Sequence, residues 1–154
     1  MDLNFSGKEL YGGFNLVASI VPSSALKSIL KGVKVEVKNS RVELTATDLE
    51  VLVKCILSAK GCDEEGGIVM PAARVNNVLR EWAGNENEEV VVSIESGNCI
   101  LRSRGGYFKI AGEDFRQFTE IAMVNTRGSV EIDGEVINDM IGRVIHSAST
   151  LKAR

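Results

Sequence analysis

Histidine, proline and cysteine are scarce in this sequence of 154 residues. It has one histidine, His146, and three cysteines, Cys55, Cys62 and Cys99, with no CxxC pair among them. A structural zinc site takes four ligands, and an odd number of cysteines does not make a disulfide framework. We therefore expect no metal ion, no cofactor and no disulfide. Cys55 and Cys99 fall at strand-like apolar positions, where we expect small core residues, and Cys62 falls in a polar loop.

Long apolar runs and an excess of positive charge are also missing. No run approaches the roughly 18 apolar residues of a membrane helix, and the first residues lack the basic start and apolar stretch of a signal peptide. We expect a cytoplasmic protein with no membrane contact. The net charge of −3 and pI of about 5.3 exclude a protein that grips nucleic acid by overall charge. They still allow one that encloses DNA with a locally basic face.

Catalytic motifs are absent as well. The sequence has no Walker A motif, no GxGxxG and no HExxH. His146 lies on an expected helix without an obvious catalytic partner, and solvated charge explains the acidic pairs Glu64-Glu65 and Glu88-Glu89 better than acid–base catalysis does. We expect a protein that is not an enzyme, although a small α+β enzyme with an unrecognised site stays open as an alternative.

What the sequence does have is a repeated unit. The apolar fraction is 44% with only 5% aromatic residues, so the core must be mainly aliphatic. Residues 1–58 predict a strand, a helix and three strands, and residues 67–112 predict the same order again. The first helix is expected to run to Pro22 and the long strand to begin at Leu49. The chain then forms an α+β fold in which one antiparallel sheet is covered on one face by two helices.

A third copy begins but is not completed. Val130 to Gly134 echo the first strand, and a helix with one apolar face follows. A lone strand and helix cannot bury that face by themselves, so we expect the first part of a longer protein. Residues 113–128 predict a linker. The expected domains are residues 1–124, and residues 125–154 as the first strand and helix of a truncated second domain.

Four segments resemble the bacterial DNA sliding clamps, the β subunit of DNA polymerase III. They are Val21-Pro-Ser-Ser-Ala-Leu-Lys-Ser-Ile-Leu30, Leu44-Thr-Ala-Thr-Asp-Leu-Glu50, Met70-Pro-Ala-Ala-Arg-Val75 and Glu113-Asp-Phe-Arg-Gln-Phe118. The second is the most specific, and all four stand in register on the repeat. Ser28 replaces the proline that clamps usually carry before the Ile-Leu pair. Asp48, within the second segment, is expected to bond the backbone N–H groups of its own turn.

The resemblance implies a DNA-clamp fold with a duplicated β-α-β-β-β unit and three similar domains in each subunit. It implies a ring of two subunits that encircles double-stranded DNA and tethers the polymerase. The polymerase and the clamp loader would bind through domains beyond this chain. The alternative is a free-standing, clamp-like interaction module that binds a protein through its edge strand.

A clamp needs only weak, salt-sensitive contacts with phosphates. The residues expected to face DNA, on polar helix faces and nearby loops, are Lys8, Asn15, Ser24, Lys27, Arg80 and Arg143. The resemblance places Ser24 where many clamps carry an arginine that contacts DNA, so that contact looks lost and Lys27 could substitute. Each basic residue could equally be an ordinary solvated side chain.

The strand Tyr107 to Ile110 resembles the edge that closes the ring against the other subunit. An exposed edge strand is by nature a pairing site. The interface candidates are Arg74, Val78, Arg104, Tyr107, Phe108 and Ile110, although one face of this strand must belong to the core. Gly12 and Gly13 fall inside the first helix, where each costs about 1 kcal/mol relative to alanine. One explanation is a close approach to a neighbouring helix or to DNA. The other is that tertiary packing tolerates two residues that are unfavourable in a helix.

Overall fold

The computed structural model describes residues 1–39, 41–61, 64–84, 88–119 and 130–149. The chain divides into two compact units, Met1–Ile121 and Ala122–Arg154, and each unit is described by itself. Among the described residues, no helix is long and apolar enough to cross a membrane.

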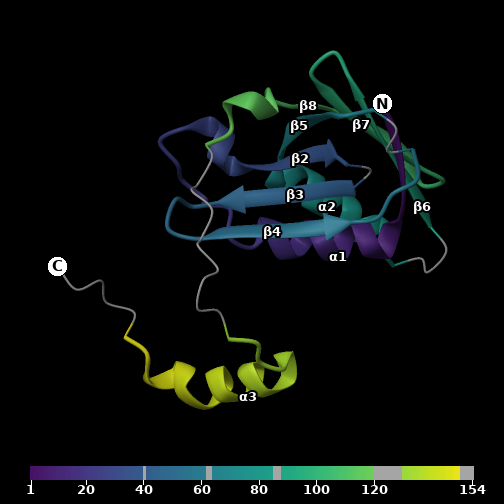
Figure 1. The fold of residues 1–154 in the computed structure, drawn as a ribbon. Helices are drawn as coiled ribbons and strands as arrows, with labels where there is room; N and C mark the ends of the chain where they lie inside the picture. Colours follow the sequence, from purple (N-terminus) through teal and green to yellow (C-terminus); the bar gives the residue numbers. More distant parts are fainter. Residues whose placement is uncertain (40, 62–63, 85–87, 120–129, 150–154) are drawn as a thin grey trace. The chain divides into compact units, whose positions relative to one another are not determined.

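The first unit contains the predicted repeat (Figure 1). Its first copy is β1 (Asp2–Ser6), α1 (Gly7–Ala18), the 3-10 turn η1 (Ser28–Lys31), β2 (Gly32–Lys38), β3 (Arg41–Thr47) and β4 (Leu52–Leu57). Its second copy is β5 (Gly66–Pro71), α2 (Ala72–Trp82), β6 (Glu89–Glu95), β7 (Asn98–Ser103) and β8 (Gly106–Ala111), followed by η2 (Phe115–Gln117). The α+β class and the duplicated β-α-β-β-β unit are confirmed.

The strands form two antiparallel sheets of four strands, where one sheet was expected. Their orders are β1-β6-β7-β8 and β4-β3-β2-β5. Each copy therefore contributes its first strand to the three strands of the other copy: β1 pairs with β6, and β5 pairs with β2. Alternation along a strand shows which side chains are buried but not which strand lies beside it. The exchange could not be predicted for that reason.

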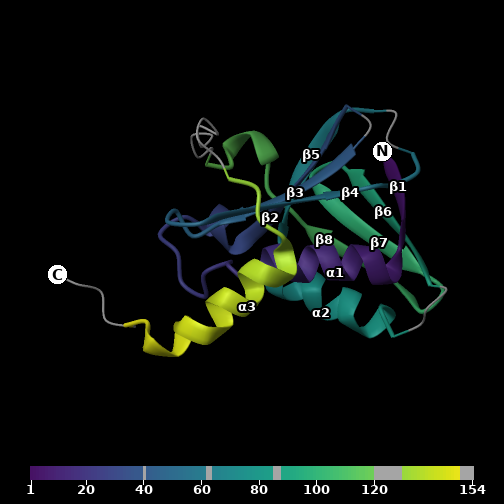
Figure 2. The same cartoon turned by 60° about the horizontal axis from the view of Figure 1, so that its bottom comes forward.

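Helices α1 and α2 lie side by side (Figure 2) and share one continuous core with both sheets. The helices contribute Phe14, Val17, Val75 and Leu79 to this core, and the strands contribute mainly alternating valines and leucines. Helix α1 ends at Ala18 and is therefore shorter than expected, because the sequence predicted a helix up to Pro22. Val21 lies beyond it and is only half-buried.

Gly12 and Gly13 differ in their surroundings. A Cβ atom added to Gly13 would lie 2.8 Å from Cδ2 of Leu57 and 3.2 Å from Sγ of Cys55, both on β4. A Cβ atom added to Gly12 would meet nothing within 4 Å. Close approach to a neighbouring element therefore explains Gly13, where the element is a strand and not a helix. It does not explain Gly12.

The Thr-Asp-Leu-Glu segment forms a hydrogen-bonded turn between β3 and β4. Oδ1 of Asp48 accepts from the backbone N–H groups of Glu50 and Val51, at 2.9 and 2.7 Å, as expected. Oγ1 of Thr47 accepts from the N–H of Leu49, at 2.9 Å, and donates to the carbonyl of Val51, at 2.7 Å. The turn holds Leu49 at a positive φ of 79°. Strand β4 therefore begins at Leu52, and the expected start at Leu49 was wrong.

Residues Glu113 to Phe118 belong to the first unit and are not a linker. The backbone of Glu113 exchanges two hydrogen bonds with Val69, at 2.9 and 3.0 Å. Phe118 is buried with Ile29, Leu30 and Val69 in a second, smaller core. Two of the family-like segments, the one ending at Leu30 and the one ending at Phe118, therefore pack against each other. The remainder of the predicted linker lies mostly outside the described residues.

The second unit contains α3 (Gly134–Val144) and the 3-10 turn η3 (Ile145–Ser147). Asp133 caps the helix, because its Oδ1 accepts from the N–H of Glu135 at 2.8 Å. The predicted helix is confirmed, but residues 130–133 form no strand. Within the described part of this unit every residue is exposed, including Ile137 and Ile141 of the apolar face.

The cysteine predictions hold in part. Cys99 is buried in the core, and this burial raises the pKa of its thiol to about 12. Cys55 is half-buried against the same core. Cys62 lies outside the described residues.

Candidate nucleic-acid interface

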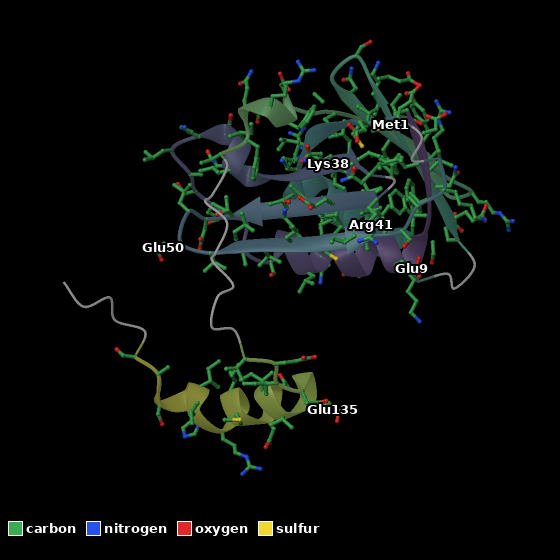
Figure 3. The ribbon with its side chains drawn as sticks, viewed as in Figure 1. Met1, Glu9, Lys38, Arg41, Glu50 and Glu135 are labelled. Carbon is green, nitrogen blue, oxygen red and sulfur yellow. The ribbon has the colours of Figure 1, made fainter. Side chains whose placement is uncertain are left out.

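The outward faces of α1 and α2 form one surface, which carries three of the residues expected to face DNA. Lys8 and Asn15 are exposed on α1, and Arg80 is exposed on α2. The two helices are linked across this surface, because Nδ2 of Asn76 donates to Oδ1 of Asn15 at 3.1 Å. Figure 3 labels Glu9 in the first turn of α1 and Glu50 in the turn between β3 and β4.

The charge of this helical surface is slightly positive. Helices α1 and α2 together contain three basic residues, Lys8, Arg74 and Arg80, and two acidic ones, Glu9 and Glu81, which gives a net charge of +1. The whole chain carries −3. The Arg80–Glu81 pair is 3.6 Å apart and exposed, so solvent screens it strongly. The helical surface can thus attract phosphates weakly without holding them tightly.

Ser24 and Lys27 lie in the segment between α1 and η1, and both are exposed. Lys27 immediately precedes η1, and its carbonyl accepts from the N–H of Leu30 at 3.2 Å. No ion pair holds the ammonium group of Lys27 within the described residues. Arg143 belongs to the second unit, where its guanidinium lies 2.8 Å from the carboxylate of Asp139.

The ring-closing candidates lie on α2, on the edge strand β8 and, in the case of Arg104, in the turn between β7 and β8. Arg74 and Val78 are one helical turn apart on α2, and Trp82 follows one turn later. The ring of Phe108 on β8 lies 5.6 Å from that of Trp82, and Phe108 is 42% exposed. Val78 is half-buried and Arg74 is exposed. Val78 on α2 and Phe108 on β8 thus occupy neighbouring positions, because Trp82 of the helix contacts Phe108 of the strand.

The side chain of Ile110 is not available to an interface, because it is only 8% exposed and packs in the main core. Tyr107 and Arg104 are exposed. The guanidinium of Arg102 lies 5.6 Å above the ring of Tyr107, and the backbone N–H of Arg104 donates to Oε1 of Glu88 at 2.9 Å. Glu88 is buried, so the expectation of a solvated loop charge was wrong for this residue.

Three residues of this region were missed in the sequence. Asn76 joins the two helices, Trp82 supports Phe108, and Arg102 covers Tyr107. Asn76 directly follows Val75, which is buried on α2. A polar residue beside a buried one is the sequence signal that could have identified Asn76. The described residues contain no group of three or more histidine, cysteine or acidic side chains that could hold a metal ion.

Comparison with known proteins agrees with this fold. Residues 1–123 match the family model of the DNA polymerase III beta subunit, N-terminal domain. The beta sliding clamp of Chlamydia muridarum is 26% identical over 155 residues, an alignment that covers the whole of this chain and 41% of that protein. The beta sliding clamp of Haemophilus influenzae is 20% identical over 147 residues and is covered to 38%. The chain thus spans about two fifths of the length of the curated relatives it matches.

Solved structures show the same fold over nearly the whole chain. The DNA polymerase III beta subunit of Pseudomonas aeruginosa matches with a TM-score of 0.86 at 20% identity, covering 100% of this chain and 41% of that one. The beta subunit of Thermotoga maritima matches with a TM-score of 0.85 at 23% identity, covering 97% and 40%. Because the family model spans most of its length, the chain belongs to the family of DNA polymerase III beta subunits, whose N-terminal domain it carries in residues 1–123.

Proposed function

We propose that this chain forms the first part of a DNA sliding clamp, a ring that encircles duplex DNA and tethers the replicative polymerase. The observation that carries the proposal is the surface of α1 and α2 in a chain of this family. Its exposed side chains are mainly polar, although Leu16 is 56% exposed, and the two helices together carry +1 while the chain as a whole carries −3. A ring holds DNA by enclosing it, so this surface needs only to be compatible with phosphates passing by.

In this proposal the protein has no catalytic role. Lys8, Asn15, Lys27 and Arg80 make weak contacts with the DNA backbone, and Ser24 makes none. Phosphate contacts position a protein on the duplex without reading its sequence, which is what a ring that must move along DNA requires. The polymerase and the clamp loader bind to parts of the subunit that lie beyond these residues.

The ring closes, in the same proposal, where β8 and α2 meet a second subunit. Strand β8 is an edge strand, and an edge presents unpaired backbone groups that can pair with another chain. Phe108 and Val78 supply apolar contact, and Arg74, Arg104 and Tyr107 surround them. Ile110 takes part only through its backbone. A free-standing interaction module that uses the same edge is not favoured, because the curated relatives that match this chain are beta sliding clamps.

The first test is the mass of the native protein in its source cells. A species about three times heavier than this 16.7 kDa chain is expected for a subunit of three similar domains. A native species of 16.7 kDa would contradict the three-domain ring.

The second test uses that native protein and a nicked circular plasmid. With a clamp loader and ATP, the protein should elute with the circle, and cutting the circle with a restriction enzyme should release it. Retention on the linear product at high salt would contradict a topological grip, because ionic contacts to phosphates weaken steeply with salt.

A further inference from the structure

Asn15 and Asn76 are the polar link between the two helices of the proposed DNA-facing surface. Asn15 is exposed and Asn76 is half-buried. The side-chain N–H of Asn76 donates to Oδ1 of Asn15, at 3.1 Å. A side-chain amide has an acceptor on one side and two N–H donors on the other. Two facing amides could therefore pair in either direction, and the direction decides which group Asn15 presents to solvent.

The surroundings of Asn76 favour the observed direction. Its Oδ1 is buried without a hydrogen-bond partner among the described residues. Reversing both amides would put an NH2 group with two donors in that position. A buried N–H without a partner is rarer in proteins than an under-satisfied carbonyl oxygen, so the reversed pair would cost more. The oxygen of Asn15 therefore stays turned toward α2.

The two N–H donors of Asn15 are in consequence left free. No hydrogen bond from its Nδ2 is formed within the described part of the chain. Asn15 shares one face of α1 with Lys8, two turns earlier, and with Gly12, three residues earlier. Because Gly12 has no side chain and open space around it, nothing at that position shields the Asn15 amide from an approaching ligand.

We infer that Asn76 is a positioning residue that holds the Asn15 amide with its N–H donors toward the phosphate oxygens of duplex DNA. The inference rests on the proposed function and deepens it, because it names the group that contacts the backbone and the residue that orients it. Neutral amides often donate to phosphates and carry no sequence information there. A fixed donor adds a contact to this surface without adding to its small positive charge.

The test is an NMR titration of the 154-residue chain with a short DNA duplex at low salt, which observes the side-chain NH2 signals of Asn15 and Asn76. The Asn15 signal should move progressively with duplex concentration, together with the backbone amides of Lys8 and Arg80. The Asn76 NH2 should move little and exchange slowly with solvent, since it is held in the inter-helix hydrogen bond.

Asn76→Asp provides the decisive comparison. A carboxylate accepts only, so the Asn15 amide must turn its N–H groups toward Asp and its oxygen outward. Asn77→Asp is the matched control, because Asn77 is exposed on the same helix and the substitution adds the same charge without touching Asn15. Asn76→Asp should bind the duplex about threefold more weakly than Asn77→Asp, the ratio given by one modest net hydrogen bond. The duplex-induced shift of the Asn15 NH2 should also be lost.

The outcomes separate the two proposals. Shifts at Lys8 and Arg80 with an unmoved Asn15 NH2 in the unsubstituted chain would overturn the inference and leave the DNA-facing surface standing. So would equal affinities and equal Asn15 shifts in the two aspartate variants. If no residue of α1 or α2 shifts at any duplex concentration, both proposals fall. If Asn76→Asp does not fold, the NMR titration of the unsubstituted chain tests the inference by itself.

Discussion

The paired glycines of α1 allow a stability prediction with opposite effects at adjacent positions. Glycine in a helix interior costs about 1 kcal/mol relative to alanine. Gly12 is exposed, and an added methyl group there meets nothing within 4 Å. Gly12→Ala should therefore stabilise the first unit by about 1 kcal/mol, and for a unit of this size that raises Tm by about 4 °C.

Gly13→Ala has the same gain in helix propensity but meets β4. Its methyl group would lie 2.8 Å from Cδ2 of Leu57 and 3.2 Å from Sγ of Cys55. Overfilling a packed contact costs about 1–3 kcal/mol, which offsets or exceeds the gain. Gly13→Ala should be less stable than Gly12→Ala by at least about 1 kcal/mol.

The assay is urea unfolding followed by circular dichroism, with Leu57→Ala as the second arm of a double-mutant cycle. Leu57→Ala removes the nearest methyl groups, so Gly13→Ala should cost less in that background, whereas the effect of Gly12→Ala should not change. Equal stabilisation by both glycine substitutions, or no coupling between Gly13 and Leu57, would refute the close-approach argument.

Three further predictions concern the turn, the buried thiol and the replaced arginine. Asp48→Ala removes the acceptor of two backbone N–H groups and should cost about 1–2 kcal/mol in urea unfolding, against no change for Glu95→Ala at an exposed position on β6. The pKa of Cys99 is about 12 in the folded chain against 9.0 for an ordinary thiol, so the folded state holds this proton more tightly. The bound proton of Cys99 therefore contributes to the free energy of unfolding, fully below pH 9 and progressively less between pH 9 and 12. Cys99→Ala should remove this part of the decline in stability with pH, and an unchanged slope of stability against pH would contradict the prediction. Ser24→Arg should strengthen duplex binding and steepen the dependence of log K on log salt by about 0.9, the value for one added phosphate contact, whereas an unchanged slope would place residue 24 away from DNA.

The parts of the fold that depend on neighbours along the chain were predictable from the sequence. The period of apolar residues gave both helices and the strand-helix order of each copy, since burial follows the same spacing along one element. The short side chain of Asp48 can reach the backbone of its own turn, so these hydrogen bonds were predictable too. The start of β4 was missed because Leu49 and Val51 are apolar, although the turn holds them outside the strand.

The parts that depend on distant contacts were not predictable. Glu88 follows a polar segment and looks solvated, yet it is buried and accepts from the backbone of Arg104. Phe115 and Phe118 lie in a polar stretch that resembles a linker, but the small core around Ile29 and Leu30 receives them. On the candidate surface, Lys8 and Arg80 could be placed on polar helix faces, whereas the partner of Asn15 required the position of the second helix.

The exchange of first strands explains why the two helices meet at all. Strand β1 leads directly into α1 but pairs with β6, and β5 leads directly into α2 but pairs with β2. Each helix therefore starts from a strand in the other copy's sheet, and the short connections leave it no path except across the shared core. Side by side over that core, α1 and α2 bring Asn15 next to Asn76 and turn their polar faces the same way. Neither copy alone could form this surface, because each copy supplies one of its two helices.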